Sequence, residues 1–177
     1  ATMMNKVFEI IEAKKIFDLK YNTLKILVHP KSYIHAIVKF KNGLTKILIH
    51  DTNMTIPIFN SLYENELKKI TTNELDFSVI NNLNLKNVDS KKFPVVKILN
   101  NLPNNNSLYE TIIVSANDSL VKLFLEKKIK FTDISKILLK FIDKKEFLKY
   151  KRLIPNNIED IVKLSNYVSV KINTLDI

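Results

Sequence analysis

Four polar residues near the start of the chain have types and spacing that could bind a metal ion or a phosphorylated substrate. Asn5, Lys6, Glu9 and Glu12 lie in residues 3–17, which contain neither glycine nor proline and which we predict to be helical. On a helix, Asn5, Glu9 and Glu12 share one face, with Lys6 at its edge. A carboxylate can hold a hard divalent cation, and an ammonium or amide group can bind phosphate or hydroxyl oxygens.

The alternative interpretation of these residues is a solvent-exposed helix face. Lys6 and Glu9 have the i, i+3 spacing of an ordinary ion pair on a helix surface. Charged helix faces usually face water, so spacing alone favours this alternative. The opposite side of the same helix is predicted to contain Val7, Ile10, Ile11 and Lys14.

The three histidines and Met54 are weaker candidates. His29 and His35 are six positions apart across a proline, and His50 ends a predicted strand. They lack the pattern of a metal triad, and a hydrogen-bonded structural role fits them better. Met54 is interpreted as a packing residue, with a contact to a cofactor as the alternative.

The composition of the chain excludes several classes of site. Its 177 residues include no cysteine, which excludes disulfides, thiolate metal sites and cysteine nucleophiles. Gly43 is the single glycine, whereas dinucleotide-binding turns and phosphate loops of the Walker type need at least two. The chain therefore carries no standard fingerprint for a nicotinamide cofactor. No apolar run approaches the roughly 20 residues that span a bilayer, so we expect no membrane partner.

The net charge of +10 raises the question of a nucleic-acid partner. The lysines are spread along the whole chain, and arginine, which contacts bases and phosphates better, occurs only at Arg152. A nucleic-acid interface is expected to have a clustered basic patch instead. We therefore expect a solvated basic surface without a nucleic-acid partner. A basic module that holds nucleic acid or another polyanion without catalysis remains the alternative.

Strands are predicted in the first third of the chain. Apolar or alternating runs predict three half-buried strands, at residues 23–29, 33–40 and 44–50. Asn42 and Gly43 separate the last two runs, and Asn-Gly in that position is a strong hairpin signal. Pro57 then begins a short apolar helix over residues 58–63.

Helices are predicted in the last third. Residues 64–91 have a weak, polar pattern and are expected to contain little regular structure, except around residues 77–85. Phe93 and Pro94 begin a short helix, and Ser107 with Glu110 matches a capping box at the start of a longer one. Two more amphipathic helices are predicted to start near residues 132 and 156, so the last third is predicted to form a small helical bundle.

Several short runs resemble, in the same order, motifs of the 1-deoxy-D-xylulose 5-phosphate reductoisomerase family. Residues 1–9 read Ala-Thr-Met-Met-Asn-Lys-Val-Phe-Glu, where the family has Ala-Thr-Met-Met-Asn-Lys-Gly-Leu-Glu. Residues 29–35 are similar to the family's His-Pro-Gln-Ser-x-x-His. Further similar runs follow at residues 54–58, 75–77, 93–94, 115–118 and 131–134. Each run is weak alone, but the ordered set is highly specific.

The resemblance implies an α+β fold in three parts. Residues 1–63 would form half of a mixed α/β catalytic domain, residues 64–106 a connecting arm, and residues 107–177 a C-terminal helical bundle. The family's nicotinamide-binding domain and its other metal ligands would precede residue 1. The chain alone is therefore expected to be inactive.

The resemblance also implies the activity. The enzyme would be an oxidoreductase and isomerase that uses NADPH and Mg²⁺ or Mn²⁺ to convert 1-deoxy-D-xylulose 5-phosphate to 2-C-methyl-D-erythritol 4-phosphate in isoprenoid biosynthesis. A homodimer in the cytoplasm is implied, or in the plastid of a eukaryote. A non-catalytic homologue that only dimerises is a further alternative.

The resemblance assigns roles to individual residues. Asn5 and Lys6 would bind the sugar phosphate, and Glu9 would bind both the substrate and the metal ion and act as a catalytic residue. His35 and Glu12 are secondary candidates, and Met54 is a weak candidate for a cofactor contact. The chain departs from the family pattern nearby, with Val7 and Phe8 in place of Gly-Leu and Lys15 in place of Trp.

Overall fold

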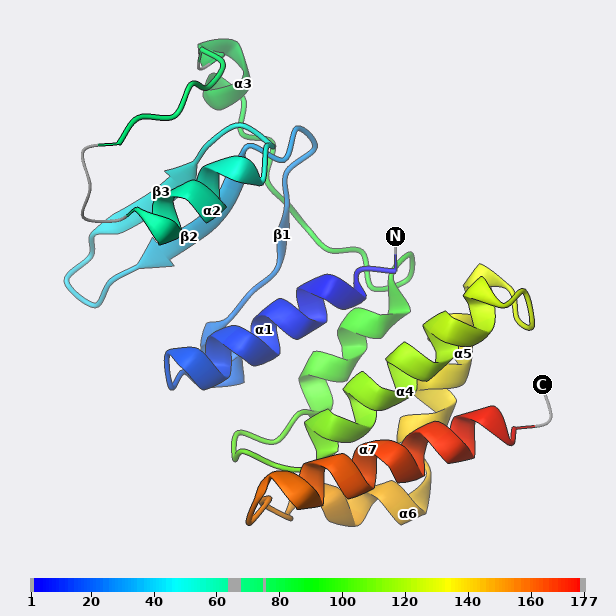
Figure 1. Ribbon diagram of the computed structural model, residues 1–177. Coiled ribbons are helices and arrows are strands. Elements are labelled where there is room, and N and C mark those ends of the chain that lie inside the picture. The colour runs from blue at the N-terminus through cyan, green and yellow to red at the C-terminus, as the bar shows by residue number, and fades with distance from the viewer. Residues whose placement is uncertain (1, 64–67, 75, 176–177) are drawn as a thin grey trace. The chain divides into compact units, whose positions relative to one another are not determined.

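The computed structural model describes residues 2–63, 68–74 and 76–175, and contacts divide the chain into two compact units (Figure 1). Unit 1 joins the described residues up to Ile26 with those from Asp89 onward, and unit 2 is Leu27–Val88. The domain boundaries expected after residues 63 and 106 stay a prediction about the complete enzyme. Within the chain, the first helix belongs with the C-terminal helices because its apolar side packs into their core.

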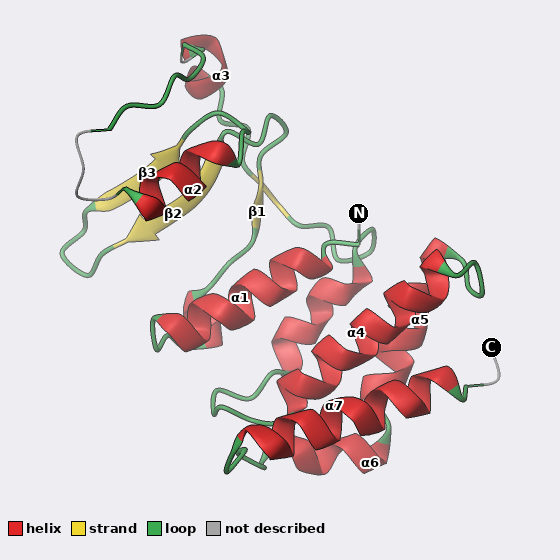
Figure 2. Cartoon of the chain, viewed as in Figure 1, coloured by secondary structure: helices red, strands yellow, loops and turns green. Residues whose placement is uncertain are grey.

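Unit 1 is helical, as predicted for the last third of the chain (Figure 2). Its central helix is α4, which contacts α5 and α7, while α1 contacts the 3-10 segment η2. The elements of unit 1 are α1 (Met4–Ile16), η1 (Tyr21–Thr23), η2 (Pro94–Asn101), α4 (Tyr109–Leu125), α5 (Phe131–Ile142), α6 (Lys145–Leu148), η3 (Lys149–Lys151) and α7 (Ile158–Asn173).

The core of unit 1 forms where the apolar stripes of these helices meet. Helix α4 is central because it is buried along most of its length, with Ile112 and Leu120 fully buried. Leu138 of α5 and Val168 of α7 are also fully buried. Two pairs of serine hydroxyls join α4 to α7, and the Ser115 Oγ–Ser165 Oγ distance is 2.9 Å.

The caps of these helices differ in part from the prediction. Helix α7 is capped by Asn157, whose side chain accepts a hydrogen bond from the Asp160 N–H at 2.9 Å, one residue beyond the predicted start. The predicted capping box at the start of α4 is wrong, because the N-cap residue is Leu108 and no side chain caps the helix. Ser107 Oγ accepts a hydrogen bond from the Tyr109 N–H at 3.3 Å, and the Glu110 carboxylate accepts one from the hydroxyl of Tyr21.

Unit 2 contains the strands, which form two antiparallel pairs. The predicted hairpin is confirmed, since β2 pairs with β3 and Gly43 occupies the turn with φ +88°. The elements of unit 2 are β1 (Leu27–Val28), β2 (Ile34–Lys39), β3 (Thr45–Ile49), α2 (Thr55–Leu62), α3 (Phe77–Asn81) and β4 (Lys86–Asn87).

Two strand predictions need correction. The strand expected over residues 23–29 is reduced to the two residues of β1, because only Leu27 and Val28 pair with β4 and Thr23 belongs to a 3-10 helix. The prediction that one face of the hairpin is buried is also wrong within this chain, because every residue of β2 and β3 except Ile34 and Ile49 is exposed. A two-stranded sheet has too little neighbouring structure to cover its own apolar side chains.

The fold class is α+β with a helical C-terminal region, as predicted. Among the described residues, no helix combines the length and the apolar character needed to cross a membrane.

Candidate functional site

Helix α1 carries four of the predicted site residues on its exposed side. Asn5, Lys6, Glu9 and Glu12 are all exposed, and we call them the α1 face. The helix forms because its other side is buried through Met4, Val7, Ile10, Ile11 and Lys14. The predicted division of α1 into a polar and a buried side is therefore confirmed.

Lys6 and Glu9 bind each other on the α1 face. Lys6 Nζ donates to both carboxylate oxygens of Glu9, at 2.9 and 2.8 Å, and about half of each side chain is exposed. This is the surface ion pair that the alternative interpretation expected. Such a pair contributes about 0–1 kcal/mol to stability, so a divalent cation or a phosphate group can separate its members.

Glu9 fits a divalent cation as one ligand among several. Its carboxylate supplies the hard oxygen atoms that Mg²⁺ and Mn²⁺ prefer. Across residues 2–63, 68–74 and 76–175, however, no group of three or more His, Cys, Asp or Glu side chains is arranged to hold a metal ion. The described chain therefore offers part of a metal site, with the remaining ligands to come from elsewhere.

The histidines lie in unit 2 and make hydrogen bonds there. His29 is buried, and its Nδ1 accepts from the Tyr33 N–H at 3.1 Å. The His35 and His50 rings stack with centroids 3.5 Å apart and planes 4° apart. His35 Nε2 lies 3.2 Å from the His50 carbonyl oxygen. These contacts agree with structural roles, and the secondary role of His35 at a substrate pocket stays a prediction.

Met54 also lies in unit 2, directly before α2. Its side chain is 66% exposed, so the interpretation as a packing residue is wrong within this chain. A cofactor contact at Met54 stays a prediction. The structure thus gathers the α1 face on one helix and pairs His35 with His50 in the other unit.

Sequence reasoning missed a buried polar cluster behind α1. Glu110 of α4 is 3% exposed, and its Oε1 accepts a hydrogen bond from the Tyr21 hydroxyl at 2.9 Å. Lys14 is also buried, and its Nζ donates to Asn106 Oδ1 at 2.7 Å. The one available signal was the lysine on the apolar side of α1, because a buried ammonium needs a polar partner.

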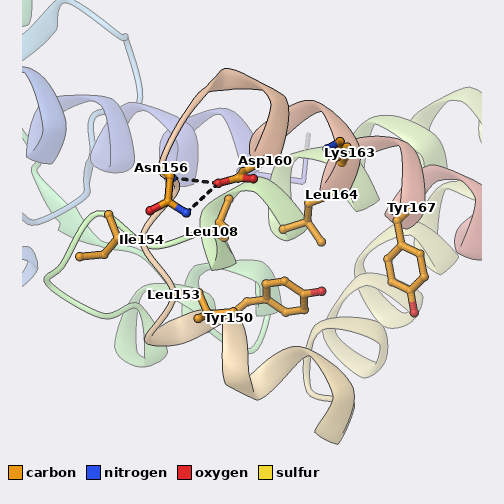
Figure 3. Close-up of a pocket in the computed structure, with 9 residues that line it drawn as sticks. All are labelled: Leu108, Tyr150, Leu153, Ile154, Asn156, Asp160, Lys163, Leu164 and Tyr167. Atoms are coloured by element: carbon orange, nitrogen blue, oxygen red, sulfur yellow. Dashed lines mark hydrogen bonds between the residues drawn. The ribbon is translucent and has the colours of Figure 1, made fainter.

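The described residues also line two pockets in unit 1, and neither contains a residue of the α1 face. One, of 410 Å³, lies between α7 and the segment before it (Figure 3). Figure 3 shows Asn156 and Asp160 joined at one end of this pocket and Tyr167 at the other. The Asp160 carboxylate is already engaged, since Asn156 donates to it through both its backbone N–H and its side-chain amide. The second, of 270 Å³, lies beside Thr2 and the start of α5.

The comparisons with known proteins agree with one another. Residues 50–169 match a family model described as the DXP reductoisomerase C-terminal domain. The 1-deoxy-D-xylulose 5-phosphate reductoisomerase of Pelagibacter ubique (strain HTCC1062) is 63% identical over all 177 residues, which is 46% of that protein. The enzyme of the same name from Sulfurihydrogenibium sp. (strain YO3AOP1) is 38% identical over 84% of this chain and 40% of its own length.

Solved structures give the same result. The 1-deoxy-D-xylulose 5-phosphate reductoisomerase from Zymomonas mobilis, in complex with NADPH, has a TM-score of 0.80 and 29% identity over 98% of this chain and 44% of its own. A crystal structure of DOX-P reductoisomerase with NADPH, fosmidomycin and magnesium has a TM-score of 0.83 and 27% identity over 98% of this chain and 43% of its own. The chain thus spans less than half the length of these relatives.

Proposed function

Because the chain belongs to the 1-deoxy-D-xylulose 5-phosphate reductoisomerase family, we propose that it is the C-terminal part of an enzyme that converts 1-deoxy-D-xylulose 5-phosphate to 2-C-methyl-D-erythritol 4-phosphate. The reaction uses NADPH and a divalent cation, Mg²⁺ or Mn²⁺, and serves isoprenoid biosynthesis in the cytoplasm or, in a eukaryote, the plastid. The observation that carries the proposal is the 63% identity to one such enzyme across every residue of the chain.

The α1 face is the part of the substrate site that this chain contributes. Lys6 binds phosphate or hydroxyl oxygens of the sugar phosphate through its ammonium group, which the structure holds at the surface. Asn5 lies one residue away and is exposed, and its amide can both donate to and accept from a hydroxyl group. The two side chains therefore orient a flexible substrate relative to Glu9.

Glu9 supplies one carboxylate ligand to the divalent cation and also contacts the substrate. The cation, when bound, stabilises negative charge that develops on the substrate oxygens during the rearrangement. The Lys6–Glu9 ion pair supports separate roles for Lys6 in substrate binding and Glu9 in metal binding. The two groups are adjacent, and the surface ion pair between them is weak. If Glu9 held the cation, the adjacent Lys6 ammonium would be available to bind the phosphate group of the substrate.

The nicotinamide site and the other metal ligands belong, in this proposal, to the part of the relatives that the chain does not cover. The single glycine supports that assignment, because a standard dinucleotide-binding turn needs several. The complete enzyme is proposed to be a homodimer that has no nucleic-acid or membrane partner.

The test is an assay of the full-length protein that contains this chain. We expect NADPH absorbance to fall when 1-deoxy-D-xylulose 5-phosphate and Mg²⁺ are both present, with 2-C-methyl-D-erythritol 4-phosphate as the product. Removing the cation with a chelator should abolish the activity, and adding Mg²⁺ or Mn²⁺ should restore it. A folded full-length protein that consumes no NADPH under these conditions would refute the proposed function.

A further inference from the structure

Polar contacts join the C-terminal end of α1, and the turn after it, to the residues around the start of α4. Lys14 Nζ donates to Asn106 Oδ1 at 2.7 Å, and the Tyr21 N–H donates to Asn104 Oδ1 at 3.0 Å. The Tyr21 hydroxyl donates to Glu110 Oε1 at 2.9 Å. The partners are 83 to 92 residues apart in sequence, so these bonds fix a long-range contact.

Glu110 is the centre of this cluster. Its Oε2 is buried and accepts no hydrogen bond from the part of the chain that the structure describes, and Lys15 Nζ lies 3.6 Å from it. A buried carboxylate is costly unless an opposite charge or a hydrogen-bond donor compensates it. The compensating groups, Tyr21 and Lys15, come from α1 and the turn that follows it. The burial of Glu110 therefore depends on the position of α1.

The Tyr21 hydroxyl stays a hydrogen-bond donor at neutral pH. Burial raises the pKa of Tyr21 well above its usual value, and the charge of Glu110 and the hydrogen bond to it raise that pKa further. The phenol is thus neutral, and the carboxylate is the acceptor.

The apolar side of α1 does not by itself fix how the helix is rotated. Burial of Val7 and Ile10 is favourable in any orientation that removes them from water, whereas hydrogen bonds depend on direction. The rotation of α1 about its own axis determines where the side chains of the α1 face lie. A side-chain atom about 6 Å from a helix axis moves by roughly 1 Å when the helix turns by about 10°. A displacement of that size at a reacting centre costs on the order of 10²-fold in rate.

We propose that Glu110 is a positioning residue for the substrate site. By binding Tyr21 and Lys15 it holds α1 in the rotation that directs the α1 face toward the substrate and the metal ion. The inference rests on the proposed function of the α1 face. Glu110, a buried residue of the helical bundle, thereby affects catalysis at the opposite side of α1.

The test uses the full-length enzyme with Glu110→Gln and Tyr21→Phe, and Tyr109→Phe is the matched control. Tyr109 is also buried, and burial followed by the charge of Asp143 raises its pKa to about 12. Its hydroxyl donates to the Ile142 carbonyl oxygen at 3.1 Å, so Tyr109→Phe removes a comparable buried hydrogen bond whose acceptor lies in α5. Tyr21→Phe removes only the hydroxyl oxygen atom and keeps the aromatic ring in the core. This milder variant still tests the inference if Glu110→Gln does not fold.

All variants are assayed at a temperature at which circular dichroism shows them to be folded. We expect Glu110→Gln and Tyr21→Phe each to lower kcat/KM for the sugar phosphate roughly tenfold and to raise the Mg²⁺ concentration needed for half-maximal activity. The double variant should lose no more than the larger single loss, because both changes act on the same cluster around Glu110. Tyr109→Phe should lower Tm by a similar amount and leave both kinetic quantities unchanged.

If Tyr21→Phe and Glu110→Gln lower Tm but retain normal kinetics, as the control does, the cluster is merely structural and the inference is wrong. If instead the unmodified full-length protein has no activity, the proposed function fails, and hydrogen exchange then tests the positioning role separately. Amides in residues 5–12 should exchange faster in Tyr21→Phe than in Tyr109→Phe. Equal exchange rates in the two variants would overturn the inference.

Discussion

Lys6 and Glu9 are exposed on α1, where each partly neutralises the other. The sequence predicted this placement, because the spacing of polar and apolar residues determines which side of a helix is buried. It did not predict Glu110. The partner of Glu110, Tyr21, is 89 positions away, and capping patterns compare only residues within one turn. Long-range polar partners cannot be read from local spacing.

Lys6→Ala in the full-length enzyme should chiefly raise KM for the sugar phosphate, by roughly ten- to a hundredfold, with a smaller change in kcat. The physical reason is that an ammonium binds the phosphate group in the ground state as well as in the transition state. Lys171→Ala is the matched control. Lys171, on α7, also forms an ion pair with a glutamate, at 2.7 Å from Glu146 Oε2. Lys171→Ala should leave KM for the sugar phosphate unchanged. A normal KM in Lys6→Ala would remove Lys6 from the substrate site.

The elements that the sequence predicted best were those with long, regular patterns. Helix α1 begins and ends within a residue of its predicted limits, and α5 begins at Phe131, one residue before the predicted start. Asn42 and Gly43 located the hairpin turn. Helix α6 was missed because its four residues are too few to show a period of 3.6. The shortening of β1 was missed because an apolar run does not show how many of its residues find a pairing partner, and only Leu27 and Val28 pair with β4.

Gly43→Ala should destabilise unit 2. Gly43 has φ +88°, and an added Cβ would meet no atom within 4 Å, so the expected cost is backbone strain alone. That strain is about 1 kcal/mol for an alanine in the left-handed region. Urea unfolding of the purified protein measures the loss. Gly43→Asn is the control and should cost less, since asparagine tolerates this conformation better. An alanine variant as stable as the unmodified protein would show that the turn does not require glycine.

The division of the whole molecule into two units was not predicted. Helix α1 belongs to the same unit as the helices after Asp89, although residues 27–88 separate them in sequence. The sequence showed that each helix has an apolar side but not which sides meet. The resemblance in ordered motifs, in contrast, identified the family that the comparisons support across the whole chain.

The 177-residue chain alone should neither oxidise NADPH with the sugar phosphate nor bind NADPH tightly. Its single glycine cannot form a standard dinucleotide-binding turn, and its described residues hold no complete metal site. Isothermal calorimetry with NADPH measures the binding directly. Micromolar affinity would contradict the assignment of the cofactor site to the remainder of the enzyme.

The central claim is that the α1 face supplies a metal ligand to a reductoisomerase, and kcat of Glu9→Gln in the full-length enzyme tests it most directly. Glutamine keeps the shape of the side chain but lacks the charge that a hard divalent cation needs. At saturating Mg²⁺ we predict that kcat falls by a factor of roughly 10² or more, because the cation acts mainly on the transition state. Glu12→Gln, on the same helix, should cause a smaller loss. Near-normal turnover by a folded Glu9→Gln enzyme would contradict the account of the site.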